Sequence, residues 1–407
     1  MSNVNGKSLS ASDDKNNIIP IRPERIVWMD GLKGFACIMV MLNHMLHLFY
    51  PAYHFGESMM SHLNGYETKL YNSPLRFVVE SRINVSIFCL LSGIVVALQV
   101  MNLSNVKDKL PSIVFKRYFR LMLPVLPAGI IVWIMLKLNL FTNVAAAMLT
   151  GSPWSAQYYR EPVGLATILS SVIVKMWFYG DDVVSTALWV MPQIFYGSFL
   201  TILLALLYWK MKRKAIYPYI VVFIFLIPRH DHVGAFVLGV ILAMLVKEEL
   251  VDIGKLLKSQ NAGILAGVIF IAIGLLFGGY PDYTEPVDFY SRFNIGNVEL
   301  YYNLGSFCLV LGIYNCAGIK KILSTKAFQF LGSICYEVLI LHIPVLFSVG
   351  TGIIILLANM NVGYNISVII SSVITIPLII VLSWIYGKYV GKYAGIVTNK
   401  IATYLER

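Results

Sequence analysis

Apolar runs long enough to cross a lipid bilayer recur along this chain from end to end. A helix rises 1.5 Å per residue, so about 20 apolar residues span the roughly 30 Å hydrocarbon core. The chain has 407 residues, of which 58% are hydrophobic and 13% are charged, against the roughly 25% charged share of soluble domains. A soluble fold does not fit this composition, and we expect an all-helical, multi-pass integral membrane protein embedded in the lipid bilayer.

Ten of these runs are expected to be transmembrane helices. They lie near residues 27–49, 84–101, 119–138, 187–208, 216–228, 233–246, 262–279, 300–317, 330–358 and 364–388. The fifth and sixth runs are short and are interrupted by the segment 228–232. These two runs could therefore be two short spans or one re-entrant pair.

The basic residues predict the orientation of the bundle. The chain carries 32 Lys and Arg and a net charge of +11. When ten spans are threaded from a cytoplasmic N-terminus, most of these residues fall in the inner segments, as the positive-inside rule requires. We therefore predict a protein of the cell membrane with both ends in the cytoplasm. The same rule explains the net positive charge of the chain, so no nucleic-acid partner is expected.

The spans form one predicted domain between two tails. Residues 1–24 are polar and poor in aromatics, which predicts a disordered cytoplasmic tail with no evident cleavable signal peptide. Residues 25–390 hold the spans, and residues 391–407 are expected to be a second cytoplasmic tail. The five cysteines all fall in apolar runs without CxxC or metal-ligand spacing, so we expect small core residues and no metal site. Nothing in the sequence predicts an oligomeric state.

Three long outer segments, near residues 50–83, 139–186 and 280–299, are rich in aromatic and acidic side chains. Aromatics beside acids are a common surface for binding sugars, but Trp and Tyr also gather at membrane interfaces without any ligand. Either interpretation fits a single residue of this group. Its members are Trp154, Tyr158, Trp177, Asp181, Asp182, Asp282, Glu285 and Asp288.

Ionisable side chains inside a span are costly and are candidates for function. Lys33 and His44 lie eleven residues apart in the first span, so they share a helix face to within about 20° and are about 16 Å apart along the axis. Asp30 lies three residues before Lys33 and can pair with it. An imidazole such as His44 could take a proton from a hydroxyl, and the Lys33 cation could bind phosphates.

Structural interpretations of the same residues stay open. His44 and His47 could simply hydrogen-bond neighbouring helices. For His342, in the ninth run, a structural role fits about equally well. Glu337 in that run could pair with a lysine of an inner loop. Arg82 opens the second span and is a further candidate.

The first span resembles the signature of the acyltransferase family 3 membrane proteins. It reads RIVWMDGLKGFACIMVMLNH from Arg25 to His44, and the Arg-x10-His pair of the family maps onto Lys33 and His44. Lysine keeps the charge of the usual arginine but lacks its planar fork, which can grip a phosphate at two points.

Further segments agree with this family in order and spacing. FCLLSGIVV contains Ser92, KRYFRLMLP contains Arg117 and Arg120, and FLGSICYEVLILHIPV contains His342. ALWVMPQIFYGS, which contains Trp189, is similar to a segment in which the family has a glutamate, but Gln193 and Ile194 stand there instead. The resemblance covers nearly the entire chain.

The resemblance implies a membrane O-acyltransferase. Such an enzyme moves an acyl group, usually acetyl from the co-substrate acetyl-CoA, to a hydroxyl of a surface or exported glycan, and needs no bound cofactor. His44 would act as general base or carry the acyl group covalently, and the residues do not separate these two mechanisms. The expected roles are catalysis for His44, Asp30 and His342, acyl-CoA binding for Lys33, Arg117 and Arg120, and substrate positioning for Arg82, Ser92, Trp189 and Glu337.

Two other classes of protein compete with this interpretation. Ten spans with intramembrane His and Glu would also suit a proton-coupled secondary transporter or a glycan flippase, although such carriers usually show inverted repeats or paired broken helices. Because the glutamate is missing, a binding protein without enzymatic activity also fits the sequence. Hydrolysis of a thioester by the purified protein would distinguish the enzyme from both.

Overall fold

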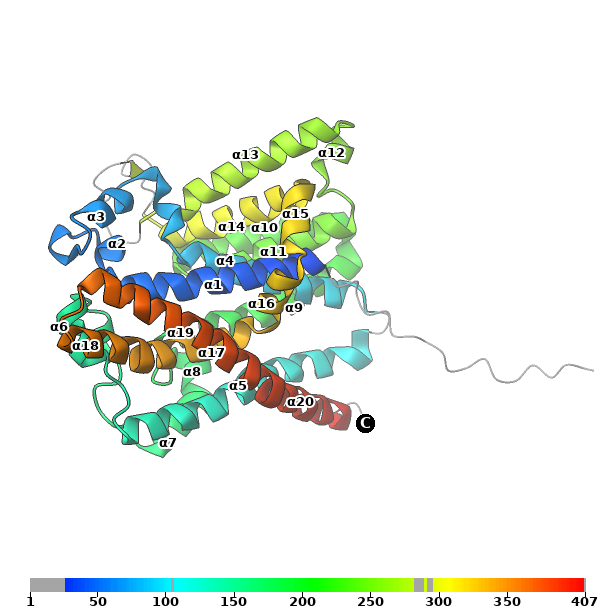
Figure 1. Cartoon of the computed structure of the whole chain (residues 1–407). Helices are drawn as coiled ribbons and strands as arrows, with labels where there is room; N and C mark the ends of the chain where they lie inside the picture. The colour runs from blue at the N-terminus through cyan, green and yellow to red at the C-terminus, as the bar shows by residue number, and fades with distance from the viewer. Residues whose placement is uncertain (1–25, 104–105, 282–288, 291–295, 406–407) are drawn as a thin grey trace, which may run out of the picture.

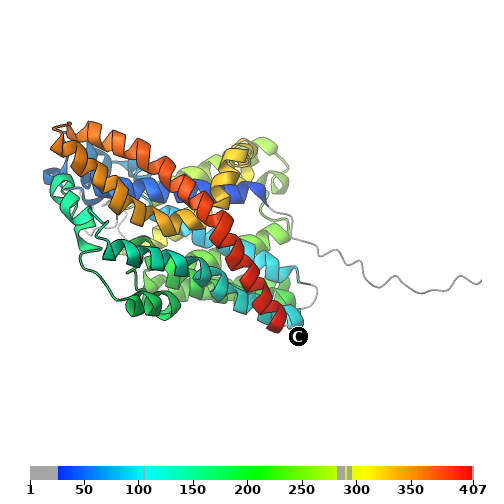
Figure 2. The same cartoon turned by 60° about the horizontal axis from the view of Figure 1, so that its bottom comes forward.

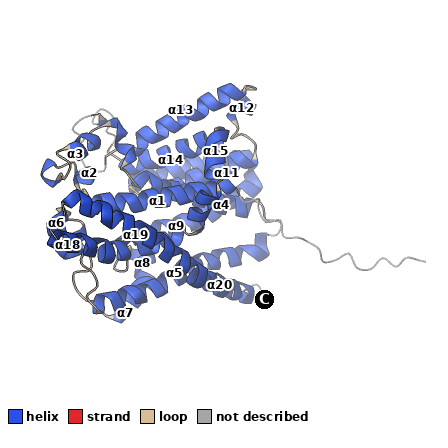
Figure 3. Cartoon of the chain, in the orientation of Figure 1, coloured by secondary structure: helices blue, strands red, loops and turns tan. Residues whose placement is uncertain are grey.

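The computed structural model describes residues 26–103, 106–281, 289–290 and 296–405. Throughout these ranges the regular structure is helical, and none of the described residues forms a strand (Figure 3). The predicted all-helical fold class is therefore confirmed. The tail predicted for residues 1–24 lies outside the described residues.

The described helices follow one another along the whole chain. They are α1 (Val27–Phe49), α2 (Ala52–Phe55), α3 (Tyr66–Tyr71), α4 (Arg82–Met101), α5 (Val106–Lys137), α6 (Asn143–Thr150), α7 (Leu165–Ser170), α8 (Met176–Tyr179), α9 (Met191–Met211), α10 (Ile216–Leu226), α11 (Val233–Lys247), α12 (Ile253–Leu256), α13 (Gln260–Gly278), α14 (Val298–Asn315), α15 (Ala317–Leu323), α16 (Lys326–Ser333), α17 (Cys335–Val345), α18 (Thr351–Asn359), α19 (Tyr364–Tyr386) and α20 (Lys392–Leu405).

Each of the ten predicted runs contains a helix, but fewer segments have the length of a full span. Among the described residues, seven helical segments are long and apolar enough to cross a membrane, or eight if α14 and α15, bent by 100°, count as one. One of the seven, Thr186–Arg229, covers two predicted runs. The fold is that of a polytopic membrane protein, and the count of ten spans stays a prediction.

The fifth and sixth predicted runs form short helices. The chain turns back after α9. The Tyr219 hydroxyl of α10 donates to the Leu204 carbonyl of α9 at 3.0 Å, and a continuous helix would hold residues 15 positions apart far from each other. Lys212, at the turn, has a positive φ of 51°. The 11 residues of α10 are only about 16 Å long, and the 15 of α11 about 22 Å, so neither alone crosses 30 Å of hydrocarbon.

Most of the long helices run in a common direction through the bundle. The first turn of α1 and the last turn of α20 lie at one end of the bundle, and α2, α3 and α6 lie at the other (Figure 1). Figure 2 shows α19 and α20 crossing one face of the bundle diagonally. Both described chain ends thus lie on the same side. The assignment of that side to the cytoplasm stays a prediction.

Glycines of the family-like motifs let α1 and α16 meet backbone to backbone. A Cβ on Gly34 would lie 2.4 Å from the Gly332 nitrogen, and a Cβ on Gly332 would lie 2.1 Å from the Asp30 carbonyl oxygen. No larger side chain fits at these positions. The predicted run 330–358 is not continuous, because α16 ends at Ser333 and α17 begins at Cys335.

The break before α17 aligns that helix with α1. The Cys37 thiol donates to the Cys335 carbonyl at 3.2 Å, and His44 Nδ1 lies 2.9 Å from His342 Nε2. The two contacts are seven residues apart on each helix, so α1 and α17 run parallel and in register. All five cysteines are free and buried or half-buried, in agreement with the role predicted for them.

The C-terminal segment is part of the bundle. A π-helical turn, Gly387–Gly391, joins α19 to α20, which packs along α5. The Tyr386 hydroxyl donates to the Pro124 carbonyl of α5 at 2.6 Å. The domain boundary expected at residue 390 therefore falls within a helical segment that packs against the transmembrane domain.

Candidate active site

A cavity of about 1380 Å³ runs through the bundle, with walls from α1, α4, α5, α9, α17 and α20. All ten residues predicted for the site line it. They are Asp30, Lys33, His44, Arg82, Ser92, Arg117, Arg120, Trp189, Glu337 and His342. The cavity therefore brings together residues more than 300 positions apart in the sequence, and their individual roles stay predictions.

Two histidines meet midway along this cavity. His44 Nδ1 and His342 Nε2 are 2.9 Å apart, and His342 Nδ1 lies 2.7 Å from the Val338 carbonyl oxygen. The carbonyl accepts only, so the neutral His342 carries its proton on Nδ1 and accepts from His44 on Nε2. His44 therefore carries its proton on Nδ1. Its Nε2 is unprotonated and has a free lone pair, as a general base requires. These tautomers follow from the hydrogen bonds.

A tryptophan of the loop between α6 and α7 stacks on the same histidine. The Trp154 ring lies 5.5 Å from the His44 ring at 9° and 4.4 Å from the His47 ring at 11°. Its loop is fixed to α1 because the Ser152 hydroxyl donates to the His47 carbonyl at 2.9 Å. His47 stacks in turn on His54 at 3.8 Å. Four rings are thus held in one stack at the outer half of the cavity.

We call the end of the cavity nearest the start of α1 the inner end and the opposite end the outer mouth, after the predicted topology. Cations line the inner end. Lys33, Arg117 and Arg120 all lie in its wall. The side chain of none of the three makes a hydrogen bond or a close ion pair with another described residue. The pairing between Asp30 and Lys33 stays a prediction, and both residues line the cavity. These cations remain available for an anion.

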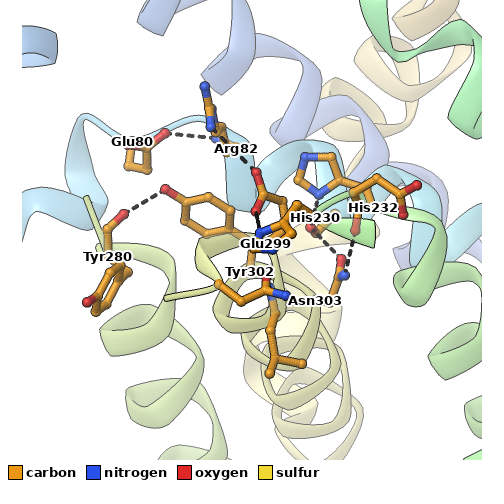
Figure 4. Close-up of polar contacts among 12 residues, drawn as sticks. Glu80, Arg82, His230, His232, Tyr280, Glu299, Tyr302 and Asn303 are labelled. Atoms are coloured by element: carbon orange, nitrogen blue, oxygen red, sulfur yellow. Dashed lines mark hydrogen bonds and ion pairs between the residues drawn. The ribbon is translucent and has the colours of Figure 1, made fainter. Parts of the chain in front are cut away.

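The opposite mouth of the cavity holds charges that are already paired. Arg82 Nη1 lies 3.9 Å from Glu299 Oε1, and His230 Nδ1 lies 3.6 Å from Glu299 Oε2 (Figure 4). Behind them, His232 Nδ1 lies 2.6 Å from the Ser86 hydroxyl, which donates to Asn303 Oδ1 at 3.1 Å. Figure 4 shows these residues converging from α4, α14 and the loop before α11.

Comparison with known families decides the class of this protein. A family model described as an acyltransferase domain, acyltransferase family 3, matches residues 26–386. The chain belongs to the acyltransferase 3 family. It is a membrane acyltransferase, which favours the enzyme over the transporter and over the inactive binding protein. No curated protein and no solved structure matches the chain.

Gln193, one of the two residues that stand in this acyltransferase where its family usually has a glutamate, has a structural role. Its side-chain oxygen accepts from the His232 backbone N–H at 2.9 Å, and Gln193 also lines the cavity. The amide therefore holds the loop that leads into α11. Burial first, and then the positive charge of Arg82, lower the pKa of His232 to about 3, so this histidine is neutral at physiological pH.

A buried ion pair supports the outer mouth of the acyltransferase. Arg76 and Glu80 lie 3.2 Å apart, with 1% and 3% of their side chains exposed. Glu80 also accepts from the Arg82 backbone N–H at 3.1 Å. Burial alone would raise the pKa of Glu80, but the charge of Arg76, together with His54, Arg82 and the backbone hydrogen bond, holds that pKa below its usual value.

Several of these residues were beyond the reach of sequence reasoning. Trp154 carried only the general signal of an aromatic in an outer segment, and Arg76 and Glu80 carried none beyond their i, i+4 spacing. Of the other outer residues, Tyr158 and Asp182 line the cavity, whereas Trp177 is buried in the core. Asp282, Glu285 and Asp288 lie outside the described residues. No group of three His, Cys, Asp or Glu among the described residues could hold a metal ion.

Proposed function

We propose that this protein is an O-acyltransferase of the cell membrane that moves an acyl group from cytoplasmic acyl-CoA to a hydroxyl of a surface or exported glycan. Acetyl-CoA is the expected donor. The CoA phosphates would bind Lys33, Arg117 and Arg120. The acceptor would enter from the opposite mouth, between Arg82 and Trp189.

The observation that carries this proposal is the order of groups along one cavity. Unpaired cations lie at the end that holds both described chain ends, the pair of His44 and His342 lies midway, and hydrogen-bonding and aromatic groups lie at the far mouth. A polyanionic donor and a neutral, hydroxyl-rich acceptor need these opposite environments. A reaction between them must then take place near the histidines.

The hydrogen bonds of the histidine pair support direct transfer. His44 Nε2 takes the proton of the acceptor hydroxyl while that oxygen attacks the thioester carbonyl carbon. The tetrahedral intermediate then breaks its C–S bond, and the departing sulfur takes the proton from His44, leaving an ester and free CoA thiol. His342 accepts the hydrogen bond from His44 Nδ1 throughout and stabilises the imidazolium.

A covalent route uses the same atoms. His44 Nε2 would attack the thioester carbonyl carbon, break the C–S bond and expel CoA as the thiolate, and so carry the acyl group as an acyl-imidazolium. The acceptor hydroxyl then takes the acyl group, and its proton passes to the thiolate. The stacked Trp154 supports both routes, because the face of an indole ring attracts a positively charged imidazolium. Rapid mixing with radiolabelled acetyl-CoA in the absence of acceptor separates them, since only the covalent route labels the protein.

The test of the proposal is release of CoA thiol from acetyl-CoA by the detergent-purified full chain, with membrane glycan as acceptor. We expect His44→Ala to lower turnover by about 10²- to 10⁴-fold, the usual contribution of a general base. His62→Gln is the matched control. His62 stacks on Tyr364 and binds the Thr150 carbonyl, away from the cavity walls, so this variant should keep its turnover.

Two results would contradict the proposal. Turnover by a folded His44→Ala variant at the wild-type rate would remove the central residue. A wild-type protein that releases no thiol from acetyl-CoA or from longer acyl-CoAs, with glycan supplied, would exclude acyl-CoA as the donor.

A further inference from the structure

Glu337 is a largely buried residue whose carboxyl lies in the wall of the cavity. Only 9% of this residue is exposed. Apart from its own backbone N–H, its carboxyl has no hydrogen-bond or ion-pair partner among the described residues. None of the described lysines forms the ion pair that the sequence suggested for it. The carboxyl faces the cavity, where a ligand can supply a hydrogen bond that the described side chains do not.

The wall opposite this carboxyl is shaped to receive it. A Cβ on Gly391 would lie 2.8 Å from Glu337 Oε1, and a Cβ on Gly387 would lie 3.2 Å from Glu337 Cδ. Both glycines belong to the π-helical turn Gly387–Gly391, and such turns occur frequently at functional sites. The missing side chains leave the carboxyl beside the open space of the cavity.

The register of α1 and α17 fixes the height of Glu337 between the cations and the histidines. Cys37 and Cys335 lie at the same level, because they share a hydrogen bond. Lys33 is four residues below that level, about 6 Å, and Glu337 is two residues above it, about 3 Å. His342 lies a further five residues along, about 7.5 Å. Glu337 therefore sits near the middle of the interval of about 16 Å.

We propose that Glu337 binds the amides of the pantetheine arm of the acyl donor. This inference rests on the proposed function, which places phosphates at Lys33 and the thioester at His44. The pantetheine arm is the part of CoA that joins phosphate to sulfur, and it carries two amides and one hydroxyl. A carboxyl oxygen at mid-height can accept a hydrogen bond from an amide N–H of this arm. Glu337 thereby distinguishes a CoA thioester from a bare nucleotide.

The test compares two ligands that differ only in the arm. Binding of CoA and of 3′-phosphoadenosine 5′-diphosphate, which is CoA without pantetheine, is measured by calorimetry on the detergent-purified full chain. We expect Glu337→Leu to weaken CoA about tenfold, the effect of one lost hydrogen bond, and to leave binding of the nucleotide unchanged. Glu337→Gln keeps the acceptor oxygen and should bind CoA within about twofold of wild type.

A second pair of variants leaves the carboxyl in place. Gly391→Ala puts a methyl group against Glu337 Oε1 and should weaken CoA in the same selective way. Gly318→Ala in α15, where a Cβ meets nothing within 4 Å, is its control. Equal CoA binding by Glu337→Leu and wild type overturns the inference, as does equal weakening of both ligands.

The outcomes also separate this inference from the proposed function. If wild type binds CoA with the expected dependence on Glu337 but transfers no acyl group, the proposed function fails and the inference stands. If wild type transfers acetyl groups while Glu337→Leu binds CoA normally, the inference fails alone. Wild-type protein that binds no CoA at all overturns both.

Discussion

The charged side chains are unpaired at one end of the cavity and form ion pairs at the other. At the inner end, Lys33, Arg117 and Arg120 line the cavity without an ion pair to any described residue. At the outer mouth, Arg82 faces Glu299 at 3.9 Å and Arg229 faces Asp231 at 2.8 Å. One end holds a net positive charge, and the other holds charges that are already compensated.

This difference indicates two kinds of ligand. Unpaired cations in a restricted space repel one another, so they favour a ligand that brings several negative charges. A mouth of paired charges and fixed hydrogen-bonding groups favours a neutral ligand recognised by geometry. If the comparison is right, removing an inner charge weakens donor binding, whereas removing an outer charge weakens the fold.

The largest effect is expected at the outer end, in the pair of Arg76 and Glu80. Arg76→Met removes the ion-pair partner of the buried Glu80 charge, which should cost about 3–5 kcal/mol of stability. Chemical denaturation of the purified protein in mixed micelles measures this loss. Arg213→Met is the matched control, because Arg213 pairs with Glu248 at 2.6 Å while 64% of its side chain is exposed. That variant should lose less than about 1 kcal/mol, and equal losses would contradict the comparison.

At the inner end the expected change is in binding. Arg117→Ala should raise the KM for acetyl-CoA about 10- to 100-fold, since a hydrogen bond to a charged group contributes about 1.5–3 kcal/mol. Its stability should stay at or above that of wild type because repulsion from Arg120 is relieved. Arg82→Gln serves as the contrast, with an altered KM for the acceptor but not for acetyl-CoA. A lower stability of Arg117→Ala without any change in KM would reverse the assignment of the two ends.

Acid should destabilise the outer end. The pKa of His232 is about 3 in the fold and about 6.5 in the unfolded chain. Below pH 6.5 the unfolded chain therefore binds a proton that the folded protein excludes, and stability is lost as the pH falls toward 3. Between pH 6.5 and pH 5 this loss is about 2 kcal/mol at most.

The check on this prediction is the slope of stability with pH, measured by thermal denaturation in detergent. His232→Gln should flatten the slope, because glutamine does not titrate. The charge of Arg82 lowers the pKa of His232, and the charge of Glu80 raises it. Arg82→Gln should therefore bring this pKa slightly closer to its value in the unfolded chain and make the slope slightly shallower. A slope that His232→Gln leaves unchanged would show that other groups carry the acid sensitivity.

The smallest effect is expected at Trp154. Loss of its stacking on His44 should lower turnover about 2- to 12-fold, from an aromatic or cation–π contribution of about 0.5–1.5 kcal/mol. Trp154→Leu should show this loss, and Trp154→Phe should recover most of it because the ring face is kept. The KM for acetyl-CoA should not change in either variant. Equal turnover of the leucine and phenylalanine variants would exclude a role for the aromatic face.

Much of the fold was predictable because hydrocarbon imposes a simple pattern. The ten apolar runs are helical, since a chain in lipid must satisfy its backbone internally. The interruption at Ile334 was not predictable, because Phe330 to Val345 reads as one apolar stretch. It depends on the contact of Gly332 with the α1 backbone, and no local pattern reveals a contact between residues 300 positions apart.

The site was predictable where residue types are costly in lipid. His44, His342 and Glu337 stand out as polar groups within apolar runs, and all three line the cavity. Trp154 did not stand out, because its loop has no periodicity and tryptophan is common at interfaces. The pairing of Asp30 and Lys33 stays a prediction, because helical spacing permits a contact without requiring it.

The matched seven-residue interval on α1 and α17 limits how the length of this protein can change. One residue inserted between Cys37 and His44 would turn His44 by about 100° and advance it by 1.5 Å. That shift would separate it from both His342 and Trp154. Insertions should therefore not be tolerated in residues 37–44 or 335–342, and tags or circular permutation sites belong outside these two intervals.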